Sequence, residues 1–208
     1  MRKALKNNDW RLFCGVCAYS AVVCAQAQAF PSKPIRMVIP FSPGAASDFL
    51  GRTIGQKLGE RYGQQVVNDN RPGAGGVVGT ATVAKAAPDG YTWLSTTASH
   101  TNTPPFNKNV PFDPVKDFSH VSLLAQNFGQ AVVVPLGSPT KNIQDLIALA
   151  RKQPGKLNYA SAGIGTASHV PAELMKSMAN VDIVAVQYKG TPEGMTDLIA
   201  GRMDVMFI

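Results

Sequence analysis

The chain of 208 residues contains 20 Lys and Arg against 13 Asp and Glu, and 45% of its residues are hydrophobic. This length can bury the core of one or two domains, and a charged fraction of only 16% argues against an intrinsically disordered chain. The 19 glycines and 15 prolines follow no three-residue period, which excludes a collagen-like fibre.

Residues 1–29 have the pattern of a secretory signal peptide. An apolar run without charge covers residues 12–25, and the small residues at 25–29 offer cleavage after Ala27 or Ala29. The run is short for a membrane span, so an uncleaved anchor is the lesser alternative. Lipoprotein processing at Cys24 is also less favoured, because Val23 precedes it. The basic head that completes the pattern consists of Arg2, Lys3, Lys6 and Arg11, opposed only by Asp9.

Cleavage changes both the charge and the cysteine content. The mature chain would keep 16 basic and 12 acidic residues, a scattered net charge of +4, which argues against nucleic-acid binding. It would hold no cysteine, because Cys14, Cys17 and Cys24 all lie in the signal, so neither disulfides nor thiolate chemistry are expected.

Strands and helices alternate in the first half of the mature chain. A strand over residues 35–40 leads through a small-residue loop into a helix, where Leu50, Ile54 and Leu58 predict one buried stripe. A strand at 65–68, a turn at 70–76, a helix over about 77–86 and a strand at 91–95 follow. Residues 96–117, with four prolines, are expected to form a long loop that is functional or wraps a surface.

The second half repeats this alternation. We predict strands at 121–125, 131–134, 156–160 and 183–186, and a helix through Leu174 and Met178. The Thr191-Pro192-Glu193 sequence is typical of a helix start, with Thr191 as cap, and Gly201 would end that helix. Met203, Val205 and Phe207 then alternate into a last strand. An earlier helix would be capped by Asn142 with Asp145 at its third position, and its inner face would comprise Ile143, Leu146, Ile147 and Ala150.

This order indicates parallel sheets covered on both faces, whose ligands bind beyond the carboxyl ends of the strands. Two small-residue segments connect a strand to a helix at that position: the first loop, residues 41–48, and the second loop, residues 161–169. Glycines let a ligand approach the backbone closely, and helix amino ends carry partial positive charge. Both loops therefore suit an anion such as a carboxylate, although plain turn chemistry also accounts for either loop alone.

The sequence lacks most of the common enzyme motifs. The glycines from residue 73 lack dinucleotide-fingerprint spacing, since Val78 stands where glycine is needed, and neither a P-loop, G-x-S-x-G nor H-E-x-x-H occurs. His169 and Glu173 share a helix face but make a weak metal site, so we expect no cofactor and no metal. Glu173 and Asp48 have the default role of stabilising helix amino ends. One enzymatic alternative stays open, a secreted hydrolase using Ser161 or Ser168 with His169.

Five segments in order resemble the periplasmic receptors of tripartite tricarboxylate transporters, the Bug receptors. The resemblance covers residues 30–208 and is carried by residues 35–48, 70–76, 111–118, 159–169, and 188–190 with 197–201. It implies an α/β fold of two lobes, of the type II periplasmic-binding-protein or Venus-flytrap kind, with parallel or mixed sheets flanked by helices. The implied divisions are a signal peptide at 1–29, lobe 1 at 30–124 and lobe 2 at 125–208. Family members continue beyond Ile208, so we expect a C-terminally truncated chain with an unpaired strand edge.

The resemblance also implies that both loops act as pincers on a ligand carboxylate. Neither loop contains Arg or Lys, so recognition would rest on backbone dipoles, hydroxyls and bridging waters. Two departures from the family pattern, Ala45 and residues 191–194, leave the ligand's identity open. Carried over by position, the first pincer comprises Phe41, Ser42, Pro43, Gly44, Ala45 and Asp48, and the second comprises Ser161, Ala162, Gly163, Gly165, Thr166 and His169.

The expected function is a periplasmic solute-binding receptor, monomeric when full length, that passes a small carboxylate to a membrane permease. Binding would drive hinge closure of the lobes. A ligand-sensing module that signals to a partner shares the same site and stays open as an alternative.

Overall fold

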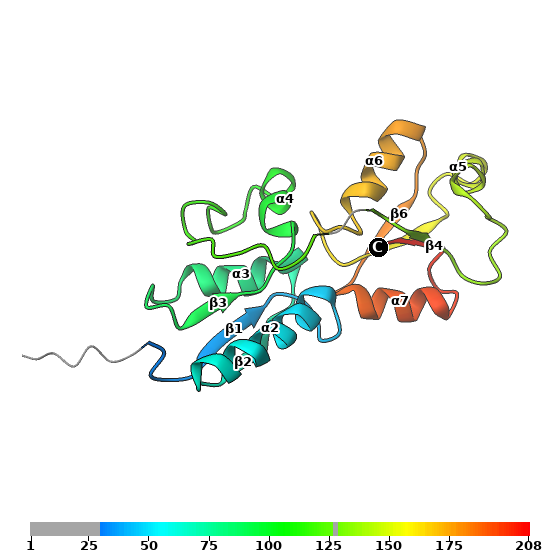
Figure 1. Ribbon diagram of the computed structural model, residues 1–208. Helices are drawn as coiled ribbons and strands as arrows, with labels where there is room; N and C mark the ends of the chain where they lie inside the picture. The colour runs from blue at the N-terminus through cyan, green and yellow to red at the C-terminus, as the bar shows by residue number, and fades with distance from the viewer. Residues whose placement is uncertain (1–29, 127–128) are drawn as a thin grey trace, which may run out of the picture. The chain divides into compact units, whose positions relative to one another are not determined.

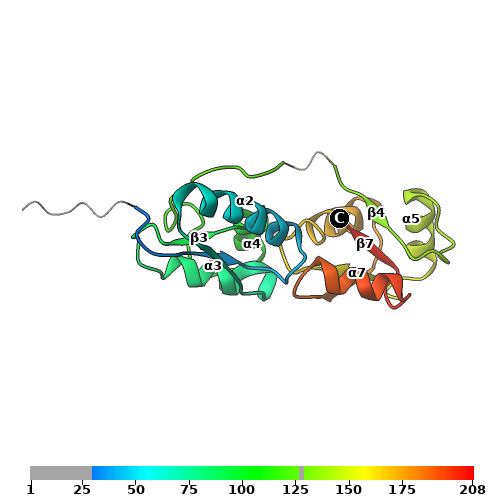
Figure 2. The same cartoon turned by 60° about the horizontal axis from the view of Figure 1, so that its bottom comes forward.

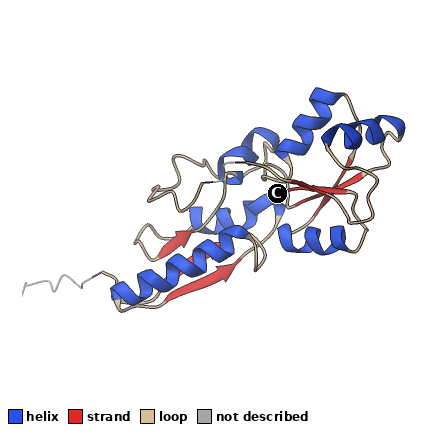
Figure 3. Cartoon of the chain, turned by 45° about the vertical axis from the view of Figure 1, so that its right-hand side comes forward, coloured by secondary structure: helices blue, strands red, loops and turns tan. Residues whose placement is uncertain are grey.

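The computed structural model describes residues 30–126 and 129–208. The expected signal peptide, its three cysteines and both cleavage sites lie outside the described residues. Residues 33–208 form one compact unit with two β-sheets and their helices (Figure 3). In the described part of the chain, every helix is too short or too polar to cross a membrane.

The first sheet is parallel throughout, with strand order β2-β1-β3. Its central strand β1 (Ile35–Ile39) pairs with β2 (Val66–Asn70) and β3 (Thr92–Leu94). Helices α2 (Ala46–Tyr62) and α3 (Val77–Ala84) lie on opposite faces of this sheet (Figure 2). The 3-10 turn η1 (Ala74–Gly76) leads into α3. The predicted strand–helix order of this half, up to β3, is confirmed.

Helix α2 contacts the sheet through small residues. Gly51 and Gly55 are buried, and a methyl group added to Gly51 would lie 3.1 Å from both Ile39 Cδ1 and Met37 Sδ. The backbone of α2 therefore lies close against β1. The predicted stripe is correspondingly only half-buried along its length: Leu50, Ile54 and Leu58.

The second sheet has strand order β4-β7-β5-β6 and is antiparallel only at β4. Its strands are β4 (Val132–Val133), β5 (Asn158–Ser161), β6 (Val184–Gln187) and β7 (Val205–Phe207). Helices α5 (Ile143–Lys152) and α6 (Val170–Ala179) lie on one face and α7 (Thr191–Ile199) on the other (Figure 1). The predicted parallel or mixed sheets flanked by helices are thus confirmed.

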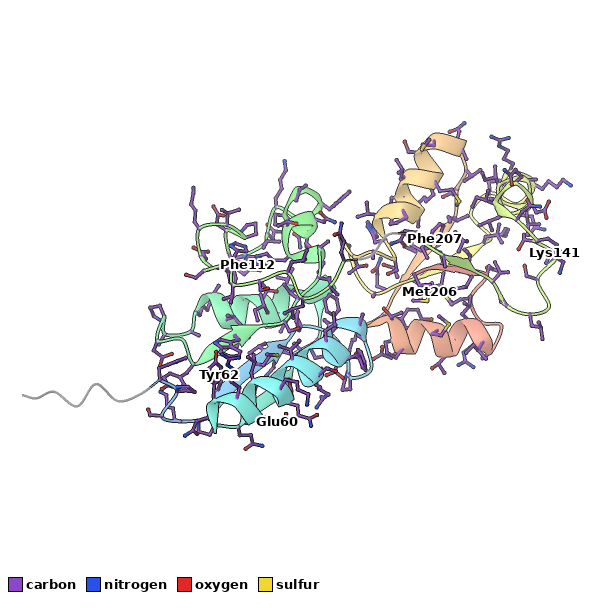
Figure 4. The ribbon with its side chains drawn as sticks, in the orientation of Figure 1. Glu60, Tyr62, Phe112, Lys141, Met206 and Phe207 are labelled. Atoms are coloured by element: carbon purple, nitrogen blue, oxygen red, sulfur yellow. The ribbon has the colours of Figure 1, made fainter. Side chains whose placement is uncertain are left out.

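Strand β7 separates two apolar cores. Phe207 packs with Leu146 of α5 and edge-on to Tyr159, at 6.4 Å between ring centroids. Met206, its neighbour, packs with Ala160 and Leu198 of α7 on the other side (Figure 4). Because adjacent residues of a strand point to opposite faces, both faces of the sheet are covered, as parallel strands require.

Several predicted elements are wrong in detail. Residues 96–117 contain helix α4 (Ser99–Phe106), with Pro104 and Pro105 inside it. Residues 121–125 are not a strand, and the strand predicted at 131–134 has only two residues.

Two helix details also differ from expectation. The cap of α7 is Gly190, in extended conformation, so Thr191 is the first helical residue. Asn142 caps α5 as predicted, accepting from Asp145 N at 2.9 Å, but Ile143 is exposed.

Candidate functional site

The first loop connects the carboxyl end of β1 to the amino end of α2. Its residues Phe41, Ser42 and Ala45 are buried, whereas Pro43 and Gly44 are exposed. Gly44 has a φ of +85°, the left-handed region that glycine adopts without strain. The N–H groups of Ala46 and Ser47 begin helix α2 and have no acceptor within the described residues. The loop thus presents free donors at a helix amino end.

Asp48 holds the first loop from inside. Asp48 is 4% exposed, and its carboxylate accepts hydrogen bonds from Gly44 N at 2.9 Å, Asn70 Nδ2 at 2.9 Å and Arg52 Nε at 3.0 Å. Burial raises the pKa of Asp48, but the bonds from Arg52, Gly44 and Asn70 outweigh it, so its pKa lies below the usual value. The acid is thus ionised and already paired within its own chain, a role in shaping the loop.

Asn70 completes this support, a role that sequence reasoning missed. Its amide also donates to the carbonyl of Phe41 at 2.9 Å, so one side chain binds both ends of the first loop. Only its place at the end of a strand, before Arg71-Pro72-Gly73, could have drawn attention to it.

The second loop follows β5 and leads into α6, and its side chains bond mainly to the loop itself. Thr166 Oγ1 donates to Gly163 O at 2.6 Å, and Ser168 Oγ accepts from Ala162 N at 2.8 Å. Ser161 Oγ accepts from Gly163 N at 3.2 Å. These hydroxyls fix the loop's shape. The N–H groups of three residues have no acceptor within the described residues: Ile164, Ala167 and Ser168.

His169 closes the second loop. His169 is 9% exposed, and its ring Nδ1 accepts from Gly165 N at 3.5 Å. Burial lowers the pKa of His169, against the opposing effect of Glu173. Glu173 accepts from Tyr159 Oη at 2.7 Å and from Lys176 Nζ at 3.0 Å. This agrees with its expected position as a first-turn acid of α6.

No Ser–His pair is formed at the second loop. Within the described residues, the Ser161 hydroxyl bonds to Gly163, donating to its carbonyl and accepting from its N–H. Ser168 bonds to Ala162 and Thr166, and His169 to Gly165. In the described residues, neither serine has the hydrogen-bonded base that an activated nucleophile needs.

Turn η1 lies between the two loops. A methyl group on Gly76 would meet Phe41 Cζ of the first loop at 3.2 Å, and one on Gly75 would meet Ile164 O of the second loop at 2.5 Å. The start of α7 also reaches the first loop, with Pro192 Cγ 3.5 Å from a methyl group placed on Gly44. The structure therefore brings both predicted loops together around η1.

Solved structures place this arrangement among the periplasmic binding proteins. The protein solved as periplasmic binding protein BugD is 32% identical with a TM-score of 0.76, and the match covers 86% of this chain and 59% of that one. The R. palustris protein Rpa4515, solved with adipate, is 35% identical with a TM-score of 0.80 and covers 86% and 60%. MatC from Rhodopseudomonas palustris, solved with bound malate, is 28% identical with a TM-score of 0.76 and the same coverage.

The family follows from the sequence match. Residues 50–208 match the model of the tripartite tricarboxylate transporter family receptor, and the chain belongs to that family. A UPF0065 protein from a Pseudomonas species, encoded between tcbD and tcbE, is 41% identical over 199 residues, which are 94% of this chain and 59% of that protein. Protein BugT of Bordetella pertussis is 32% identical over 180 residues, 84% and 54% respectively. The chain thus spans little more than half the length of these relatives.

Proposed function

We propose that this protein is a periplasmic solute-binding receptor that captures a small carboxylate for a tripartite tricarboxylate-type permease. The supporting observation is the pair of strand-to-helix loops that meet η1. Within the described residues, the backbone N–H groups of four loop residues at or beside helix amino ends have no acceptor: Ala46, Ser47, Ala167 and Ser168. Such donors suit an oxyanion.

The charge distribution supports a receptor over an enzyme. Neither loop carries Lys or Arg, and Asp48, the one acid of the first loop, is neutralised by Arg52, with Arg52 Nη2 3.0 Å from its Oδ1. The site therefore holds an anion through dipoles without a permanent cation. The hydrogen bonds to a carboxylate would be charge-assisted and therefore strong enough to capture the ligand. Release would not require a buried ion pair between ligand and protein to be broken, so we expect capture to be reversible.

Ligands of the solved relatives narrow the class of acid. Rpa4515 was solved with adipate and MatC with malate, both small dicarboxylates. We propose an acid of this size for the present chain. In the proposed division, residues 30–124 and 125–208 belong to two lobes, each contributing one pincer loop. The signal peptide over residues 1–29 would deliver the receptor to the periplasm.

The test compares acids with uncharged analogues. Thermal-shift and calorimetric titrations would use malate, adipate, glutamate and benzoate against the purified chain. Adipamide serves as the matched control, because it keeps the length of adipate and lacks its charge. We expect binding of at least one acid and none of adipamide. Equal binding of acid and amide, or no binding of any acid, would contradict the carboxylate proposal.

The hydrolase alternative has a separate test. Ester and amide substrates of the bound acid should remain intact on prolonged incubation with the chain. Turnover that Ser161→Ala or Ser168→Ala abolishes would establish the enzyme instead.

A further inference from the structure

Helix α4 supports the second loop from outside it. Thr103 Oγ1 donates to Ile164 O at 3.0 Å, and Thr103 itself is 2% exposed. The backbone of α4 touches the same place, because a methyl group on Gly165 would lie 2.7 Å from Thr103 Cα and 2.8 Å from Thr103 N. A side chain at residue 165 would therefore separate the loop from the helix.

A second residue of the same helix face contacts the end of the loop. The ring of Phe106 lies edge-on to the ring of His169, with 5.7 Å between centroids. Thr103 and Phe106 are three residues apart and so neighbour each other on the helix surface. Helix α4 thus contacts the middle of the second loop and the residue that precedes α6.

Turn η1 provides the other half of this support. A methyl group on Gly163 would overlap Gly75 Cα, so these two residues meet backbone to backbone. Both have positive φ, +66° for Gly75 and +122° for Gly163. Ile164, whose carbonyl Thr103 contacts, lies between Gly163 and Gly165, the latter with a φ of +81°.

Gly165 makes the orientation of the Ile164–Gly165 peptide easier to change, because a flip of this peptide alters the φ of Gly165 together with the ψ of Ile164. Glycine populates positive and negative φ about equally, so residue 165 offers little resistance to a flip of this peptide. Because a trans peptide is planar, the direction of Ile164 O also fixes the opposite direction of Gly165 N–H. Gly165 N–H points to His169 Nδ1 at 3.5 Å, a bond too long to hold the plane by itself. The bond from Thr103 is the stronger restraint.

We propose that Thr103 is a positioning residue, whose hydroxyl fixes the Ile164–Gly165 peptide so that the second loop is preorganised for an acid. This inference rests on the proposed function for the identity of the ligand, but its effect on the loop exists without ligand. An ordered loop loses less conformational freedom on binding, so the restraint appears as affinity.

The first experiment measures amide hydrogen exchange in the ligand-free chain. Thr103→Val keeps the shape of the side chain and removes its hydroxyl, while Thr103→Ser keeps the hydroxyl. For Thr103→Val, we expect exchange over residues 162–169 to be about fivefold faster, the loss of one ordinary hydrogen bond, with exchange in α2 unchanged. Thr103→Ser should exchange there as the wild-type chain does. Unchanged exchange in Thr103→Val, or the same acceleration in both variants, would overturn the proposal.

The second experiment measures affinity for adipate and malate by calorimetry. We expect Thr103→Val to bind about fivefold more weakly and Thr103→Ser to bind as the wild type does. Faster exchange with unchanged affinity would make Thr103 merely structural and would also overturn the proposal. If the wild-type chain binds no acid, the proposed function is refuted. The hydrogen-exchange experiment would still show whether the Thr103 hydroxyl restrains the second loop. Should Thr103→Val not fold, Thr103→Ala removes the same hydroxyl without added bulk and takes its place in both experiments.

Discussion

Replacing Ala46 by proline would remove one backbone donor from the proposed site and leave the fold intact. Ala46 is the first helical residue of α2, where proline is tolerated because that N–H has no partner in the helix. The preceding residue, Ala45, has φ −69° and ψ 160°, the extended conformation that a following proline requires. Ala46 is also exposed, so the ring has room.

The expected loss is large because the acceptor is charged. A hydrogen bond to a charged group contributes about 1.5–3 kcal/mol. Each 1.4 kcal/mol corresponds to a factor of ten in the dissociation constant, so Ala46→Pro should weaken acid binding about 10- to 100-fold. The free energy of unfolding should change little.

Calorimetric titration with the bound acid, together with denaturant unfolding, checks this prediction. The matched control is Ile143→Pro, which places proline at the first position of α5, also after an extended cap residue. That control should bind the acid normally. Wild-type affinity in Ala46→Pro would show that this donor does not contact the ligand and would refute the dipole argument for the first loop.

The remaining predictions concern stability, pH and selectivity. Asp48→Asn should cost about 1–3 kcal/mol at pH 7 by denaturant unfolding. Since the pKa of Asp48 is lowered in the fold, its stabilisation exists above about pH 4 and is lost on further acidification; the variant's deficit should therefore shrink by pH 3. Burial lowers the pKa of His100, whose Nε2 lies 2.8 Å from a carbonyl oxygen, so stability should fall as pH drops below 6.5. His100→Gln should show a smaller drop in Tm between pH 7 and 5. An unchanged drop would show that His100 does not cause the loss of stability at low pH. Gly51→Ala should destabilise by about 1–3 kcal/mol through overpacking against Met37, although alanine favours helix; a gain in stability would show that α2 can move away. Glu193 Oε2 has no hydrogen-bond partner among the described residues. A methyl group placed on Gly190 would lie 3.2 Å from Glu193 Oε2 and 3.2 Å from Ser42 N, so this carboxylate is close to the first loop. Glu193→Gln should therefore strengthen binding of doubly charged acids over singly charged ones, and equal affinities would exclude it from ligand selection.

Periodicity predicted the parallel sheets well but not the helix α4. Pro104 and Pro105 each lack the N–H that a helix uses, and the segment carries no apolar repeat. Its helix is held by tertiary contacts, such as the bond from Thr103 and the ring of His100 stacked on Phe112 at 5.9 Å. Local sequence signals do not report contacts of this kind.

The face of α2 was misjudged for a related reason. Apolar residues at Leu50 and Ile54 predicted the buried stripe, yet Gly51 makes the closest approach to the sheet. Close packing favours small residues where a helix backbone lies against a strand, and hydrophobicity does not measure that distance. At the site, the small-residue composition located both loops. It did not indicate that Asp48 is already paired with Arg52, because that needs the helix geometry.

The backbone contact between Gly75 and Gly163 joins positions that lie far apart in the sequence. Neither position tolerates even one carbon without displacing the other segment, so no substitution at one can compensate for a substitution at the other. Glycine is therefore required at both positions together. A chimaera that takes the residues after 130 from a relative should fold and bind only where that relative has glycine at the position of Gly163.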